Sequence, residues 1–134
     1  MAATDMTNAK MGEEGADFRR LKVYQEAFEL ALAVYNRVRG FPVKEGGELT
    51  AQLRRSALSA VTNVAEGYGR RVSQKDFAHF INIAIGSVNE TMVLLEFAQC
   101  LGYFRESERI VFDKRYTLLV KRLKSLYKRL RSNR

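Results

Sequence analysis

The C-terminal part of the chain repeats a seven-residue unit three times, as KRYTLLV, KRLKSLY and KRLRSNR over residues 114–134. This repeat places apolar side chains at alternating steps of four and three residues, which is the spacing of one face of a helix. The stripe consists of Phe112, Tyr116, Leu119, Leu123, Leu126 and Leu130. The sequence therefore predicts a long helix from about residue 107 to the C-terminus, with one buried face and a basic exterior.

Three more helices are predicted from apolar residues at three- and four-residue spacing. The first covers about residues 20–39, the second begins near Glu48 and runs to the glycines at 67 and 69, and the third covers 73–101. With a single proline in 134 residues, long stretches contain nothing that stops a helix. We expect an all-α chain.

The breaks between these helices carry recognisable signals. Pro42 and the glycine pair at 46–47 predict a loop, and Gly67 and Gly69 are expected to weaken the second helix. Ser73, followed by Asp76, predicts the N-terminal cap of the third helix. Gly102 is expected to end that helix, and Ser107 with Glu108 to begin the last one.

The third helix has an apolar arc too wide for burial on one side, because Ile83, Ile85, Met92, Leu94 and Phe97 extend its main stripe. Burial on two sides favours an antiparallel up-down four-helix bundle, which we assign to residues 18–134. Residues 1–17 are polar and acidic, and we expect a disordered N-terminal tail there.

Side chains for catalysis are scarce. The one histidine, His79, and the one cysteine, Cys100, exclude most zinc sites and nucleophile–base pairs. Cys100 is expected to be reduced and buried. Glu66 and Glu90 resemble a carboxylate pair, but the chain lacks the Glu-x-x-His motifs of a di-iron bundle. We therefore expect no cofactor, no metal site and no enzyme activity, with binding or assembly as the function.

The net charge of +8 lies in the last helix, because residues 107–134 carry ten basic residues and two acids, whereas residues 1–106 are balanced. Such a field attracts RNA or DNA phosphates. The candidate nucleic-acid-binding residues are Lys114, Arg115, Lys121, Arg122, Lys124, Lys128, Arg129 and Arg131. Two other interpretations remain: an acidic protein partner, which would make the chain an assembly adaptor, and a basic exterior that only keeps the helix soluble.

A second polar group lies around the junction of the second and third helices. We assign a structural role to Arg54, Arg55, Asn63, Glu66, Arg70 and Glu90. In this interpretation Arg54 or Arg55 pairs with Glu66 or Glu90 across the two helices and sets their register.

Self-association is expected from the first helix, where Tyr24, Phe28 and Tyr35 lie beside the core stripe and predict exposed aromatic surface. Residues 1–17 lack the apolar core that a signal peptide needs, and no uninterrupted apolar run of about 18 residues occurs. The expectation is a cytoplasmic homo-oligomer without membrane contact.

Several segments resemble one bacterial family. They are residues 17–25 (DFRRLKVYQ), 53–57 (LRRSA), 63–71 (NVAEGYGRR), Phe77, Phe80, Ile83-Ala84, Gly86-Ser87, Glu90 and 101–103 (LGY). Together they resemble the proteins encoded in intervening sequences of 23S ribosomal RNA genes, over about residues 17–130. The resemblance implies a four-helix up-down bundle, a ring-like homopentamer and no established enzyme activity. The family is similar in fold to accessory variability proteins of diversity-generating retroelements, which are basic pentamers that bind nucleic acid.

Overall fold

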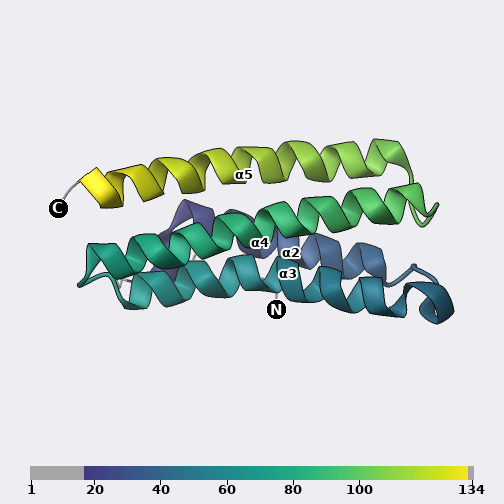
Figure 1. The fold of residues 1–134 in the computed structure, drawn as a ribbon, viewed down its shortest axis with the longest axis horizontal. Coiled ribbons are helices and arrows are strands. Elements are labelled where there is room, and N and C mark those ends of the chain that lie inside the picture. Colours follow the sequence, from purple (N-terminus) through teal and green to yellow (C-terminus); the bar gives the residue numbers. More distant parts are fainter. Residues whose placement is uncertain (1–16, 133–134) are drawn as a thin grey trace.

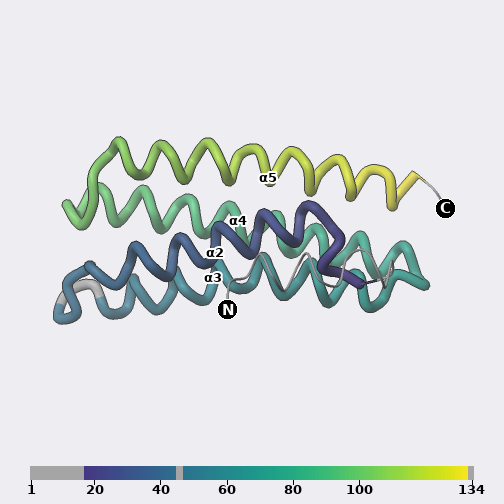
Figure 2. The backbone as a smooth tube through the Cα atoms, turned by 180° about the vertical axis from the view of Figure 1, so that it is seen from behind, coloured from purple at the N-terminus to yellow at the C-terminus, as the bar shows by residue number. Residues whose placement is uncertain are grey.

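The computed structural model describes residues 17–132, apart from the side chains of residues 45 and 46. A short 3-10 helix, η1 (Phe18–Arg20), precedes four α-helices, which are α2 (Lys22–Val38), α3 (Val43–Gly69), α4 (Gln74–Cys100) and α5 (Glu106–Ser132). Successive helices run in opposite directions along one long axis (Figures 1 and 2). The predicted antiparallel four-helix bundle is confirmed. Except for Asp17, which caps η1, the predicted N-terminal tail lies outside the described residues.

The loop predicted around residues 42–48 is mostly helical, because α3 begins at Val43, directly after Pro42. Pro42 has φ −62° and ψ 127°, an extended conformation from which a helix can start. Phe41 is 96% buried and attaches the chain to the core immediately before this point. The connection between α2 and α3 is therefore shorter than the sequence suggested.

Gly67 does not weaken α3, which continues through it to Gly69. A Cβ atom at Gly67 would lie 2.9 Å from the Cβ of Phe80 and 3.1 Å from the ring of Phe77. The glycine therefore permits close packing of α3 on α4, a role that its position in the sequence does not indicate.

Two of the three predicted helix boundaries next to α4 and α5 are confirmed. The Ser73 hydroxyl accepts the Asp76 N–H at 3.1 Å, and Gly102 has φ +83° after the end of α4. The predicted start at Ser107 is wrong, because α5 begins at Glu106. The Glu108 carboxylate reaches back to the N–H of Arg105 at 3.3 Å and supplies the cap that was assigned to Ser107.

The centre of the bundle is α4, which packs on both α3 and α5 (Figure 1). This position explains its wide apolar arc. Of the helices in residues 17–132, α4 is also the one with the length and apolar composition to cross a membrane, a property it shares with core helices of bundles. The α5 stripe faces the core as predicted: Tyr116, Leu119, Leu123 and Leu130 are buried.

Two side chains differ from their predicted exposure. Tyr24 was expected at an exposed aromatic surface, but it is 93% buried, packs edge-to-face on Phe18, and has a pKa raised by that burial. Cys100 was expected to be buried and is exposed, because it lies on the outer side of α4. Helical periodicity distinguishes inside from outside, but a residue at the edge of a stripe depends on its neighbouring helix.

Candidate nucleic-acid interface

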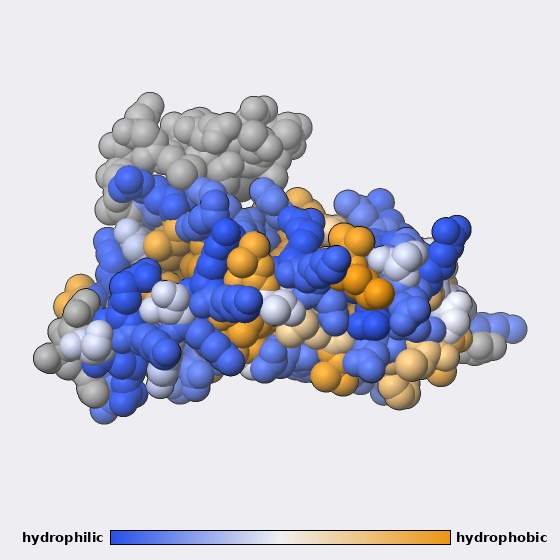
Figure 3. Space-filling model, turned by 90° about the horizontal axis from the view of Figure 1, so that it is seen from above, coloured by the Kyte–Doolittle hydropathy of each residue, from blue (hydrophilic) through white to orange (hydrophobic). Residues whose placement is uncertain are grey.

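The outer face of α5 presents a row of three lysines. Lys114, Lys121 and Lys128 are exposed and lie opposite the buried stripe. Seven residues of helix separate neighbouring members, which is about 10.5 Å along the axis. Figure 3 looks onto α5 and shows hydrophilic residues over most of this face, with apolar residues exposed between them along its middle. The row is therefore an open cationic surface.

The flank of α5 that faces α2 is partly neutralised. The Arg115 guanidinium donates to Glu29 at 3.4 Å, and the Arg122 guanidinium donates to Glu26. Arg129, the third arginine of this flank, is exposed and donates to the Ser125 hydroxyl at 3.4 Å. The eight predicted cations are thus not equivalent, because Arg115 and Arg122 also hold α5 against α2.

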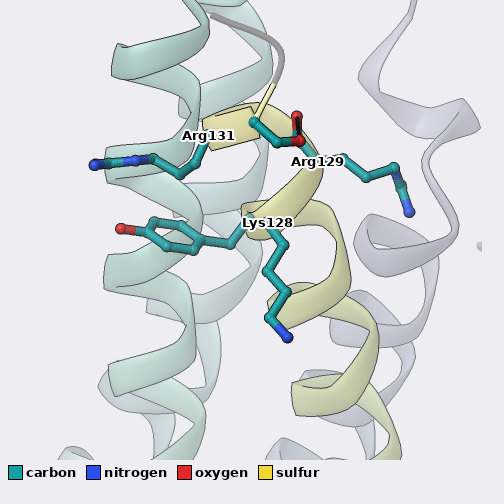
Figure 4. A pocket seen from close by; sticks show the side chains of 5 residues that line it. Lys128, Arg129 and Arg131 are labelled. Atoms are coloured by element: carbon teal, nitrogen blue, oxygen red, sulfur yellow. Dashed lines mark hydrogen bonds between the residues drawn. The ribbon is translucent and has the colours of Figure 1, made fainter.

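The flank that faces α4 carries Lys124 and Arg131, both exposed. The Arg131 guanidinium lies over the Tyr127 ring, 5.8 Å from its centroid. Near the end of α5, Arg131 and Arg129 point to opposite sides of the helix, and Lys128 extends between them (Figure 4). Because these three cations diverge, they match several phosphates along a chain better than one isolated anion.

The predicted pairing of Arg54 or Arg55 with Glu66 or Glu90 is wrong in the part of the chain that the structure describes. Glu66 accepts from Arg70 at 3.1 Å on the exposed surface, one helical turn away. Arg54 instead lies over the Tyr35 ring at 5.6 Å, and Arg55 and Glu90 are exposed. Local i,i+4 pairs form more readily than pairs that must span two helices.

The polar contacts between α3 and α4 come from small hydroxyl side chains. Thr91 donates to the Ser56 hydroxyl at 2.8 Å, and the Ser59 and Ser87 hydroxyls lie 2.8 Å apart. Asn63, which was assigned to the polar group, donates to the Ser59 hydroxyl at 3.0 Å. Of the predicted set, only Asn63 joins this network. These contacts depend on small residues on the facing sides of both helices.

The sequence also gave no indication of an ion pair that joins the last turn of α2 to the first turn of α5. The Arg37 guanidinium donates to both Glu108 oxygens, at 2.8 and 3.1 Å, and stacks over the Phe104 ring at 5.3 Å. This bidentate pair, with the Arg105 N–H, lowers the pKa of Glu108 from 4.5 to about 2. The same hydrogen bond raises the pKa of Arg37. The two residues are 71 positions apart, so no local pattern indicates the pair.

Within residues 17–132, no three His, Cys, Asp or Glu side chains gather as they would around a metal ion. His79 is exposed and packs against the Phe80 ring. The pockets of the described surface that border α5 are shallow and carry cations, including one formed by Ile110, Leu118, Lys114 and Lys121 with their neighbours. The arrangement is suited to contact with an extended surface.

A separate apolar stripe lies on the outside of α4. Val93, Phe97 and Leu101 follow each other at four-residue steps, and 64%, 59% and 51% of their surface is exposed. The stripe ends next to Cys100. Three large apolar side chains in line on a helix exterior are typical of a contact surface.

Comparison with known proteins agrees with the fold. A crystal structure of a protein of unknown function from the S23 ribosomal protein family of Bacteroides thetaiotaomicron is 27% identical, with a TM-score of 0.68 over 79% of this chain and 98% of that chain. No curated protein matches the chain. The family model for 23S rRNA-intervening sequence proteins matches residues 19–125. The chain therefore belongs to the 23S rRNA-intervening sequence protein family.

Proposed function

We propose that this protein is a non-catalytic, oligomeric four-helix bundle that binds RNA or DNA phosphates through α5. The observation that supports the proposal is the lysine row, Lys114, Lys121 and Lys128, on the open face of a helix whose residues 114–132 include no acid. A helix exterior that serves only solubility normally mixes both signs. An unbalanced cationic face attracts a polyanion instead.

Phosphate binding predicts a strong dependence on salt, because each neutralised phosphate releases counterions. The test is a gel-shift titration at several salt concentrations with the full chain and with the triple variant Lys114→Gln, Lys121→Gln and Lys128→Gln. We expect the slope of log K against log salt to fall in magnitude by about 2 to 3 in the variant.

The matched control removes the same charge from other helices, with Lys44→Gln, Arg55→Gln and Lys75→Gln, three exposed side chains. The control is expected to retain most of the parental slope. If the parent binds neither RNA nor DNA at low salt, the proposal is wrong. If both triple variants lose affinity equally, the electrostatic field of the whole protein accounts for the binding, and α5 is not the site.

The oligomeric part of the proposal is supported by the α4 stripe. Burial of Val93, Phe97 and Leu101 between subunits would remove apolar surface from water. A pentamer of 15.3 kDa chains would have a mass of about 76 kDa. Light scattering of the parent should give a mass several times that of the chain, and Phe97→Glu should lower it. A parental mass near one chain at micromolar concentration would contradict assembly.

A second candidate is an adaptor that binds an acidic protein. It is favoured by the shallow groove on α5 that Ile110 and Leu118 line together with Lys114 and Lys121, since protein partners use apolar contacts together with charges. Leu118→Gln distinguishes the two functions. This variant should leave phosphate binding unchanged but weaken the binding of an acidic protein partner. Nucleic acid would displace such a partner poorly.

A further inference from the structure

We infer that the ligand of the α5 surface is a double-stranded nucleic acid, recognised through its phosphate backbone. The inference rests on the proposed function and specifies the form of its ligand. It depends on the surroundings of the aromatic rings of α5, on the arrangement of its cations and on the charge density of the ligand.

The aromatic side chains of α5 are not available to stack on bases. Tyr116 is fully buried in the core, where burial raises the pKa of its hydroxyl. Phe112 is half-buried and packs on Phe104, with ring centroids 6.4 Å apart. Tyr127 is half-buried, and the Arg131 guanidinium lies over its ring. Proteins that bind single strands without sequence preference gain much of their affinity by stacking bases on exposed rings. The described part of α5 offers no such platform.

The cations on α5 form two rows that lie on different faces of the helix. Lys114, Lys121 and Lys128 make the first row, on the outer face. Lys124 and Arg131 make the second, on the flank toward α4, with the same seven-residue step. Close to the C-terminus, Arg129 adds a cation on the opposite flank (Figure 4). A duplex presents phosphates on two strands, so cations on several sides of one helix can be neutralised together.

A surface that contacts only phosphates prefers the ligand with the higher charge density. Double-stranded DNA carries one charge per about 1.7 Å of its axis, and its salt slope is about −0.9 per contact, against about −0.7 for a single strand. For about five contacts, these slopes are about −4.5 and −3.5. For ligands bound equally at 1 M salt, where the counterion term vanishes, the difference of about one favours the duplex by about tenfold at 0.1 M salt.

The test measures fluorescence anisotropy with four labelled probes of the same 24-nucleotide sequence: duplex DNA, duplex RNA, and the single DNA and RNA strands, chosen to lack internal pairing. Titrations at four salt concentrations give both affinity and slope. We expect each duplex to bind about tenfold more tightly than its own strand at 0.1 M salt. A preference for only one duplex would still support the inference and would identify whether RNA or DNA is the source of the backbone.

Two results would overturn the inference. If single strands bind as tightly as duplexes, α5 or another surface contacts bases, and the proposed function stands without its duplex preference. If no probe binds, the proposed function fails as well. Tyr127→Leu separates the mechanisms further: it should change duplex affinity by less than about twofold, whereas a several-fold loss confined to single strands would show that this ring stacks on bases.

Discussion

Two seams of the bundle are held by different physical means. Between α3 and α4, a glycine and small hydroxyl side chains bring the backbones close, at Gly67 and at the Ser56–Thr91 and Ser59–Ser87 hydrogen bonds. Between α2 and α5, long charged side chains connect the helices through three ion pairs: Arg37–Glu108, Arg115–Glu29 and Arg122–Glu26. The first seam depends on volume, and the second on charge.

This difference determines how each seam responds to its surroundings. A close-packed interface tolerates added atoms poorly but is insensitive to salt. Partly exposed ion pairs are screened by salt and contribute little stability each. The seam beside the candidate interface is therefore the one that a polyanion can influence, because Arg115 and Arg122 belong both to the seam and to the predicted set of binding residues.

The largest expected effect on stability comes from adding atoms to the close-packed seam between α3 and α4. Gly67→Val places side-chain atoms where a Cβ alone lies 2.9 Å from the Cβ of Phe80. We expect the free energy of unfolding to fall by about 2–3 kcal/mol, because the helices must separate to admit the new atoms. Urea unfolding followed by circular dichroism measures the change.

Gly86→Ala is the matched control, since Gly86 is also in a helix but nothing lies within 4 Å of a Cβ there. Alanine should raise stability by about 0.5–1 kcal/mol at that position. A Gly67→Val variant with parental stability would show that the α3–α4 distance is not set by this contact.

The next effect concerns the buried hydroxyl pair of the same seam. Thr91→Val keeps the volume but removes the hydroxyl that lies within hydrogen-bond distance of the Ser56 hydroxyl and of the Ser87 carbonyl. We expect a loss of about 1–2 kcal/mol in the free energy of unfolding. The exposed Thr62→Val should change it by less than about 0.5 kcal/mol.

The double variant Ser56→Ala with Thr91→Val refines this prediction. Removal of both partners leaves fewer unsatisfied groups than removal of one, so the double variant should be less destabilised than the sum of the two single variants. Strict additivity would mean that the two hydroxyls do not interact.

The charged seam predicts a dependence on pH. Arg37 and the Arg105 N–H hold the pKa of Glu108 at about 2 in the folded protein, below its ordinary value of 4.5. A lowered carboxyl pKa stabilises the fold above pH 4.5, and this contribution is lost as the pH falls toward 2. Glu108→Gln should therefore have a lower Tm than the parent at pH 7, and the two Tm values should converge between pH 4.5 and 2.

Glu90→Gln, an exposed position on α4, serves as the control and should keep a Tm near that of the parent at both pH values. A Glu108→Gln variant that differs from the parent by the same amount at pH 7 and pH 2 would show a steric effect, without a contribution from the ion pair.

The smallest expected effect links the charged seam to binding. Glu29 accepts a hydrogen bond from the Arg115 guanidinium at 3.4 Å, and Glu29→Gln should release this arginine. The free energy of unfolding should change by less than about 0.5 kcal/mol. Under the proposed function, the freed arginine should raise duplex affinity at low salt about two- to threefold and steepen the salt slope by up to about 1.

Glu96→Gln removes the same charge from α4 and frees no cation on α5, so it should increase affinity less. Equal gains in both variants would mean that net charge alone governs binding and that the α2–α5 seam does not compete with phosphates for Arg115.

The helices and their inner faces could be predicted from local periodicity. The heptad stripe of α5 faces the core as expected, and the Ser73 and Gly102 boundaries of α4 are where the sequence places them. These features depend on residues three or four positions apart, and an isolated helix already brings such residues together. The lysine row on α5 is predictable for the same reason, because it lies opposite the stripe.

The tertiary structure alone decided which cations remain open. Arg115 and Arg122 occupy the same kind of heptad position as Arg129, yet their acidic partners lie 86 and 96 residues earlier in the chain. Gly67 is likewise a contact point with α4 although it has the sequence features of a helix end. Pairing across helices depends on the rotation and separation of two packed elements, and small changes in either place a different residue opposite a given side chain. The sequence therefore determined the faces of the helices, and the packing determined which residues meet across them.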